Sequence, residues 1–254
     1  MRTDILDFHE FYRSRLGTLS AQFIGARLVE AWGDGSAQRV AGFGFAPPYL
    51  DLFSKAERRI AMAPGAQGVT QWPCDNASNS ATLVGETCWP LPDASIDRLL
   101  IIHGLEESSD PRRLMREAWR VLTPDGRLII VCAHRRGAWS LFETTPFAAG
   151  RPYLKGQLTR LLEEAMFGGP LQWNAALYFP PVQSRFVLSS ANAWERAGNR
   201  VWPGLAGVLM VEATKDMLAP AGFVRTAKER ALRPALGTAR PAGAGRNSLR
   251  DKAQ

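Results

Sequence analysis

A chain of 254 residues is long enough for one large α/β domain or two small ones, with a substantial hydrophobic core. The formal net charge is +7, but eight basic and two acidic residues from Arg225 onward supply +6 of it, so the residues before Arg225 are nearly neutral. Three widely spaced cysteines exclude a disulfide framework and a CxxC metal pair, and no RNA- or DNA-binding motif supports nucleic acid as a partner.

The first 31 residues predict two helices. Apolar residues recur at helical spacing over residues 4–31, and Gly17 is expected to separate a first helix from a second. We expect residues 1–34 to form a helical cover for the domain that follows.

Strands and helices then alternate along the chain. The clearest strand is Ile96–Ile102, because a continuous apolar run is typical of a strand buried on both faces of a parallel sheet. A helix capped by Ser109 or Asp110 follows, and "TPDG" predicts the turn after it. Other strands are expected at 38–43, 58–63, 81–86, 127–134, 171–179 and 205–214. Other helices are expected after Pro47 and Pro48, and at 155–167 and 184–199.

This alternation predicts an α/β domain over residues 35–218, with a doubly wound, mostly parallel sheet and helices on both faces. Residues 219–254 are basic and rich in Ala, Gly and Pro, which predicts a disordered tail. Two interpretations of the basic charge of this tail are open: it is either solvated or binds an anionic surface. The N-terminus lacks the apolar stretch of a signal peptide, and "LAGVLMVEA" is too short to span a bilayer. We therefore expect a cytoplasmic protein with no membrane partner.

Ligands of open parallel sheets bind beyond the carboxyl ends of the strands. The segments just past the first five predicted strands are GFGFAPP, MAPGAQG, GETCWPLP, HGLEE and HRRGAW. The first has a tight turn with two glycines, Gly42 and Gly44. This turn is the first place where we look for a nucleotide-like cofactor.

The segment from Glu86 to Ser140 strongly resembles the second half of class I S-adenosylmethionine-dependent methyltransferases of the type 11 small-molecule family. It contains "LPDASID", His103 at the end of the fourth strand, and a helix that ends in "RVLTPDG", in the order and spacing of that family. The resemblance covers residues 38–134 well. It implies a Rossmann-like methyltransferase sheet with an antiparallel C-terminal strand. It also implies S-adenosyl-L-methionine as the cofactor and an unidentified small molecule as the methyl acceptor.

The resemblance also implies a set of cofactor-binding residues. They are Gly42, Gly44, Phe45, Ala46, Met62, Glu86, Thr87 and His103. Glu86 and Thr87 match positions beside the adenine, and His103 matches the position that borders the methyl group. His103 is the candidate catalytic base, since an imidazole titrates near physiological pH. The alternative is that His103 only lines the pocket.

Two departures from the family pattern remove polar contacts to the cofactor. The first motif of the family has an acid and three glycines, and the aligned residues here are Gly42, Gly44, Ala46 and Pro48. After the second strand, Met62 and Ala63 stand where the family has an acid for the ribose. Hydrogen bonds to charged groups contribute about 1.5–3 kcal/mol each. The alternative function is therefore a catalytically inactive methyltransferase-like protein that binds or assembles with a protein partner or a second copy. Ala46 in place of a glycine also requires a negative φ.

Residues after the fifth strand are candidates for substrate binding: His134, Arg135, Arg136, Trp139 and Tyr153. Adjacent arginines can bind a carboxylate or a phosphate, and the alternative is a solvated turn. The aromatic side chains suit an apolar or planar substrate, and the alternative is core packing. Glu106 and Glu107 can balance the arginines or take part in the chemistry. No metal is expected, because no metal-binding motif is present.

Overall fold

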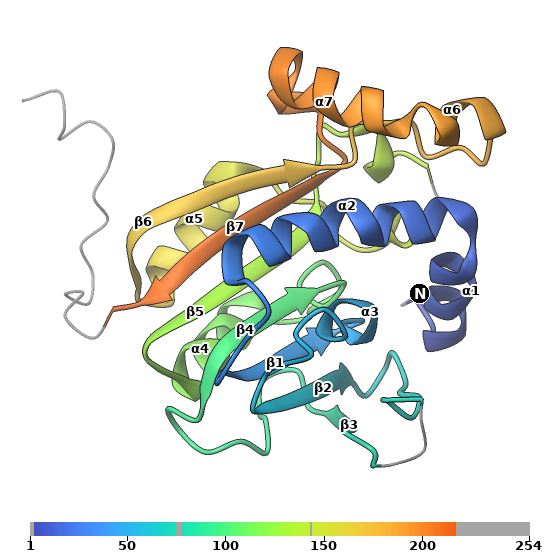
Figure 1. Cartoon of the computed structure of the whole chain (residues 1–254). Coiled ribbons are helices and arrows are strands. Elements are labelled where there is room, and N and C mark those ends of the chain that lie inside the picture. The colour runs from blue at the N-terminus through green and yellow to red at the C-terminus, as the bar shows by residue number, and fades with distance from the viewer. Residues whose placement is uncertain (1–2, 75–77, 143, 217–254) are drawn as a thin grey trace, which may run out of the picture. The chain divides into compact units, whose positions relative to one another are not determined.

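The computed structural model describes residues 3–74, 78–142 and 144–216, so the predicted tail, 219–254, lies outside the described residues. Within these ranges a seven-stranded sheet has the order β3-β2-β1-β4-β5-β7-β6 (Figure 1). Its strands are β1 (Arg39–Gly44), β2 (Arg58–Pro64), β3 (Ala81–Val84), β4 (Ile96–Ile102), β5 (Leu122–Ala133), β6 (Phe167–Ala176) and β7 (Val208–Lys215). The pairs among β1 to β5 are parallel, whereas β7 is antiparallel to both β5 and β6. This confirms the predicted Rossmann-like methyltransferase sheet with an antiparallel C-terminal strand.

Helices pack on both faces of the sheet, and α2 runs across one of them in Figure 1. The helices are α1 (Ile5–Arg13), α2 (Arg15–Trp32), α3 (Pro47–Leu50), α4 (Pro111–Val121), α5 (Lys155–Glu164), α6 (Arg185–Ser189) and α7 (Ala191–Val201), with 3-10 turns η1 (Ala138–Ser140), η2 (Pro146–Ala148) and η3 (Pro203–Leu205). Alternate residues of β4 belong to different clusters: Leu100 packs with residues of α2 and α3, and Leu99 with residues of α4 and α5. Successive side chains of a strand point to opposite faces, so each face has its own core.

Local capping explains where the first helices begin and end. The break between α1 and α2 lies at Ser14, so the predicted break near Gly17 is wrong by three residues. Ser14 is extended, and its hydroxyl accepts a hydrogen bond from the backbone N–H of Gly17 at 3.0 Å, so it is the N-cap of α2. Gly17 lies inside α2 instead, where a Cβ would be 2.0 Å from the carbonyl oxygen of Phe11.

The segment that enters β5 also differs from the prediction. "TPDG" was expected to be a turn before a strand at 127–134, but β5 begins at Leu122. Leu122 pairs with Ile96 and Arg127 pairs with Arg98, so the intervening residues form an irregularity within a continuous strand. Asp125 takes a positive φ of 61° there. Farther along, the single helix expected at 184–199 is divided at Ser190 into α6 and α7.

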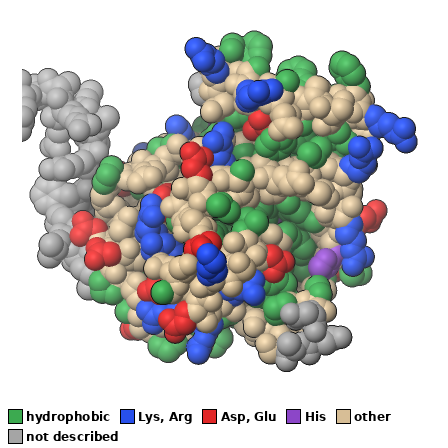
Figure 2. All heavy atoms as spheres, viewed as in Figure 1, with side chains coloured by type: hydrophobic (Ala, Val, Ile, Leu, Met, Phe, Trp, Pro, Cys, Tyr) green, Lys and Arg blue, Asp and Glu red, His purple; other side chains and the backbone are tan. Residues whose placement is uncertain are grey.

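Basic and acidic side chains are interspersed over the face of the molecule shown in Figure 2. This distribution agrees with the nearly neutral charge of the residues before Arg225. Each helix within the described ranges is too short or too polar to cross a bilayer.

Candidate cofactor-binding site

The turn after β1 brings Gly44 directly against the end of β4. Gly44 has a φ of 91°, and a Cβ there would lie 2.1 Å from the carbonyl oxygen of Ile102. The backbone N–H of Phe45 donates to the same carbonyl at 3.0 Å. Only glycine fits this position, because it accepts a positive φ and allows the two backbones to touch. The carboxyl ends of β1 and β4 therefore meet where the sequence predicts the cofactor.

Gly42 and Ala46 lie just beneath this turn and contact each other. Gly42 is within β1, and a Cβ on it would be 2.3 Å from the Cβ of Ala46. Ala46 is the N-cap residue of α3 and has a φ of −93°, so the negative φ required of an alanine there is present. Both residues are buried, and they allow α3 to pack closely on β1.

The ring of Phe45 is covered by two aromatic side chains of α1. Phe8 stacks on it with 4.9 Å between ring centroids and an angle of 10°, and Tyr12 stacks on it at 5.2 Å and 23°. Phe8 and Phe45 are each only 1% exposed. Phe8 and Tyr12 are four residues apart and so lie on one face of the helix. The sequence predicts a helical cover, but helical spacing alone does not assign Phe8 and Tyr12 to the site.

His103, the predicted catalytic residue, is buried at the end of β4 with a φ of 52°. Its Nε2 shares a 2.7 Å hydrogen bond with the hydroxyl of Tyr12, which in turn lies 2.8 Å from the hydroxyl of Tyr49. Its ring contacts those of Phe8 and Phe147, at 4.9 Å and 4.5 Å between centroids. Burial lowers the pKa of His103 to about 3, so the imidazole is neutral at physiological pH.

The end of β2 is apolar. Met62 is 1% exposed, and together with Gly44, Phe45 and Ile5 it lines a void of about 10 Å³. The other residues around this void carry no charge. The position expected to hold the ribose of the cofactor therefore offers no carboxylate.

Glu86 and Thr87, the residues expected beside the adenine, are both half-buried after β3. The carboxylate of Glu86 accepts hydrogen bonds from the backbone N–H of Ser109 at 2.9 Å and from its hydroxyl at 2.7 Å. Glu86 therefore orders the loop that precedes α4.

Glu106 is a buried acid whose place the sequence left open. Its Oε1 accepts a hydrogen bond from the backbone N–H of Ala133 at 3.0 Å, and within the described residues its Oε2 is buried without a partner. Burial raises the pKa of Glu106 to about 7. The neighbouring Glu107 instead accepts hydrogen bonds from the backbone and the hydroxyl of Thr3.

The five predicted substrate-binding residues are divided between the core and the surface. Tyr153 pairs with His134, and its backbone N–H donates to the carbonyl of Ala133 at 2.9 Å. His134 is buried, and its Nδ1 lies 3.1 Å from the carbonyl oxygen of Ala206. Arg135 and Arg136 are exposed. Trp139 is fully buried, and its Nε1 donates to the carbonyl of Phe179 at 2.7 Å. In this structure Trp139 is a core residue.

Comparison with known protein families identifies the domain that carries these residues. Residues 41–130, which span β1 to most of β5, match the family of type 11 methyltransferase domains. The chain contains a type 11 methyltransferase domain. The match is confined to these residues, and S-adenosylmethionine is the cofactor that this family implies. No curated protein matches the sequence.

Solved structures of methyltransferases share this fold at low sequence identity. An S-adenosylmethionine-dependent methyltransferase from Thermotoga maritima is 17% identical over 84% of this chain and 93% of its own, with a TM-score of 0.52. Another from Archaeoglobus fulgidus is 17% identical over 81% and 96%, with a TM-score of 0.53. A chain from the complex between the Haloferax volcanii Trm112 methyltransferase activator and its proposed methyltransferase is 12% identical over 85% and 100%, with a TM-score of 0.58. Similarity at these identities shows the fold alone.

The crevice of the methyltransferase domain does not fit S-adenosylmethionine in this arrangement. The void at the ends of β1 and β2 measures about 10 Å³, whereas small-molecule sites usually have about 300–1,000 Å³. The stacked rings of Phe8, Tyr12 and Phe45 fill the rest of this region. The site is therefore closed by side chains of the protein itself.

Proposed function

We propose that this methyltransferase acts on a small molecule. The observation that carries the proposal is the contact between Gly44 and the carbonyl oxygen of Ile102. It lies between β1 and β4, where the strand order β3-β2-β1-β4-β5 changes direction along the chain. Open α/β sheets bind their ligands at such a switch point. The family match supports methyl transfer as the reaction at this place.

Two buried titratable groups after β4 support an acceptor site on the same rim. His103 and Glu106 are 4% exposed, and shifted pKa values in a buried position are typical of functional sites. The pKa of Glu106, raised to about 7, suits proton transfer near neutral pH better than that of His103, lowered to about 3. We therefore retain His103 as a candidate base and add Glu106.

Isothermal titration calorimetry with S-adenosylhomocysteine, the demethylated cofactor, tests the proposal directly. We expect binding in the micromolar range or tighter. Transfer of a labelled methyl group from S-adenosylmethionine into a low-molecular-weight extract should follow, and it identifies the acceptor. Heat no larger than that of buffer dilution, together with no labelled product, contradicts the proposal.

The filled crevice favours a second candidate function. A methyltransferase-like protein that no longer catalyses could serve as a binding or assembly partner, and one similar structure comes from a complex with a methyltransferase activator. Under this alternative an affinity purification recovers a stoichiometric protein partner. The melting temperature then stays constant when the cofactor is added. An increase of several degrees contradicts the alternative, because a ligand that binds only the native state stabilises it.

We also propose that the protein is cytoplasmic. Cys74, Cys88 and Cys132 are free thiols in the structure, and free thiols persist in a reducing compartment. Fractionation of cells that express a tagged protein tests this location.

A further inference from the structure

One face of α1 closes the crevice. Ile5, Phe8, His9 and Tyr12 are spaced by three or four residues, so they lie on one side of the helix. Phe8 and Tyr12 stack on Phe45, and Ile5 lines the remaining void of about 10 Å³. The edge of His9 meets the ring of Phe45 at 5.3 Å between centroids. This face therefore occupies the place where the family resemblance predicts the cofactor.

Polar contacts attach the same helix to the segments that follow β1, β2 and β4. The hydroxyl of Tyr12 bonds to Tyr49 in α3 and to His103 after β4. After β2, Nε2 of His9 lies 2.8 Å from the hydroxyl of Thr70, and the backbone N–H of Ile5 donates to the carbonyl of Gln67 at 2.9 Å. The segments that follow β1, β2 and β4 are thus each bonded to α1.

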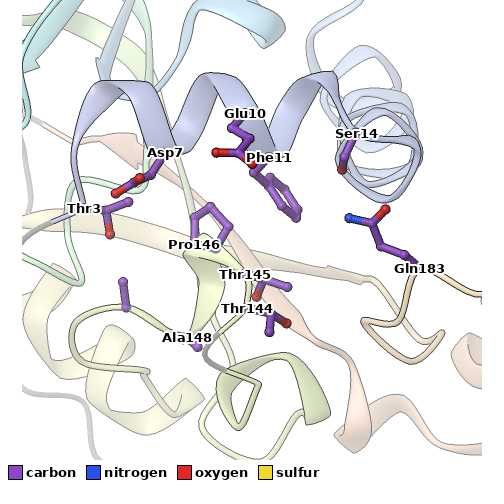
Figure 3. A pocket seen from close by; sticks show the side chains of 11 residues that line it. Thr3, Asp7, Glu10, Phe11, Ser14, Thr144, Thr145, Pro146, Ala148 and Gln183 are labelled. Atoms are coloured by element: carbon purple, nitrogen blue, oxygen red, sulfur yellow. The ribbon is translucent and has the colours of Figure 1, made fainter.

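The opposite face of α1 borders a groove (Figure 3). Asp7, Glu10, Phe11 and Ser14 line it from the side of the helix, around a volume of about 780 Å³. The other side is lined by Thr144, Thr145, Pro146, Ala148 and Ala149. Helix α1 thus lies between a filled crevice and an open groove. The groove leaves space into which the helix can move.

A single residue joins α1 to α2. Ser14 has a φ of −67° and a ψ of 158°, and it ends one helix and begins the next. Its backbone N–H bonds to the carbonyls of Glu10 and Phe11, and its hydroxyl accepts a hydrogen bond from Gly17. A change in the dihedral angles of one residue between two helices is a usual form of hinge.

We propose that α1 is a self-inhibitory plug, which admits S-adenosylmethionine only after Phe8 and Tyr12 leave Phe45 and His103 by rotation of the helix about Ser14. The proposal rests on the proposed function, because it concerns regulation of the same site. If a ligand binds only the open state, its apparent Kd equals the intrinsic Kd divided by the fraction of molecules in that state. Changes that hold or release α1 must therefore change the affinity for the cofactor in opposite directions.

A disulfide that holds α1 in place is the first test. A Cβ on Gly68 would lie 3.5 Å from the Cβ of Ile5, within the range of about 3.5–4.5 Å found in disulfides. The double variant Ile5→Cys/Gly68→Cys is made in the full chain with Cys74→Ser and Cys88→Ser, because those two thiols are exposed. We expect the calorimetric affinity for S-adenosylhomocysteine to fall at least about tenfold on oxidation and to return on reduction. Gly68→Cys alone is the control, because it has the same side chain at the same unfavourable φ of 89° but no partner at position 5. Its affinity for S-adenosylhomocysteine should not change on oxidation.

Release of the helix is the second test. Tyr12→Phe removes the hydroxyl that bonds to His103 and Tyr49, and Phe8→Ala removes a ring that stacks on Phe45. We expect each variant to bind S-adenosylhomocysteine about tenfold more tightly than the wild type, since the open state becomes more populated. Leu6→Ala is the matched control, because Leu6 is on the same helix but 69% exposed. Its affinity should equal that of the wild type.

The outcomes separate the two proposals. Equal affinity in the oxidised and reduced double variant overturns the plug and leaves the proposed function intact. Unchanged affinity in Tyr12→Phe and Phe8→Ala does the same. If neither the wild type nor any released variant binds, the proposed function fails, and the plug fails with it because α1 is then not what excludes the cofactor. If Phe8→Ala does not fold, Tyr12→Phe and the disulfide still decide.

Discussion

The hydroxyl of Tyr12 lies 2.7 Å from Nε2 of His103, although 91 residues separate them in the sequence. The same hydroxyl also bonds to that of Tyr49 at 2.8 Å, so one atom of α1 connects the segments after β1 and β4. This connection is one of the polar contacts that hold the N-terminal helix in place.

Tyr12→Phe should destabilise the protein by about 1–3 kcal/mol, because it leaves two buried polar groups without this partner. Tyr49→Phe removes one of the two bonds and preserves the bond between Tyr12 and His103, so its effect should be smaller. Urea unfolding of both variants measures the difference. Equal losses would show that the bond to His103 contributes nothing.

Gly44→Ala should destabilise the protein by about 3 kcal/mol or more, since strain at a positive φ adds to a steric conflict. The new Cβ would lie 2.1 Å from the carbonyl oxygen of Ile102, at a φ of 91°. Gly65→Ala is the control, because a Cβ added there would meet no other heavy atom within 4 Å apart from its chain neighbours, and Gly65 does not have a positive φ. Chemical unfolding should show almost no change for Gly65→Ala. A similarly small effect of Gly44→Ala would contradict the close approach of β1 and β4.

The effect of Glu106→Gln on stability should depend on pH. The pKa of Glu106 rises from 4.5 to about 7 on folding because burial disfavours the charged carboxylate. Between these values the folded state retains a proton that the unfolded state releases, so stability decreases as pH rises from 4.5 to 7. At pH 8 the full cost, up to about 3 kcal/mol, is present.

The amide of Glu106→Gln does not ionise, so this variant should be more stable than the wild type at pH 8 and similar to it at pH 4. Unfolding of the wild type and the variant at pH 4 and at pH 8 measures the difference in their free energies of unfolding. His103 acts with the opposite sign, because its lowered pKa reduces stability as pH falls from 6.5 toward 3. It is present in both proteins and cancels in the comparison. A difference that does not vary with pH would contradict the burial of Glu106 as an acid.

Glu212 joins the second helix to the sheet. Its Oε1 accepts a hydrogen bond from Nε1 of Trp32 at 2.8 Å and forms an ion pair with Arg127 at 2.7 Å, and the residue is 6% exposed. Glu212→Ala should cost about 3 kcal/mol, because removal of one partner leaves the other charge uncompensated. Glu30→Ala, which removes an exposed ion pair with Arg27, should cost less than about 0.5 kcal/mol. Thermal and urea unfolding of the two variants provide the comparison.

The sequence predicts the fold well where a pattern is local. Ile96–Ile102 is a strand with the predicted bounds, since a continuous apolar run and its flanking turns specify it. The start of β5 is different, because pairing with β4 keeps Leu122 in the sheet despite the turn residues that follow. Ser14 divides the first two helices because its hydroxyl accepts a capping hydrogen bond. The low helix propensity of Gly17 does not interrupt α2.

The meeting of Gly44 and His103 at one rim is also predictable, but the packing of α1 on that rim is not. The order of strands places Gly44 and His103 at the same rim, as the resemblance implies. The stacking of Phe8 on Phe45 depends on how a separate helix packs onto that rim. Spacing along the chain shows that Phe8 and Tyr12 share a face, but it does not show what that face covers.

The contact between Gly42 and Ala46 links the two departures from the first motif of the family. The family has an acid where this chain has Gly42 and a glycine where it has Ala46, and a Cβ at 42 would lie 2.3 Å from that of Ala46. The two departures therefore compensate each other in volume and form one coupled exchange. An acid at position 42 would avoid this steric conflict only with glycine at position 46, so packing couples the two positions.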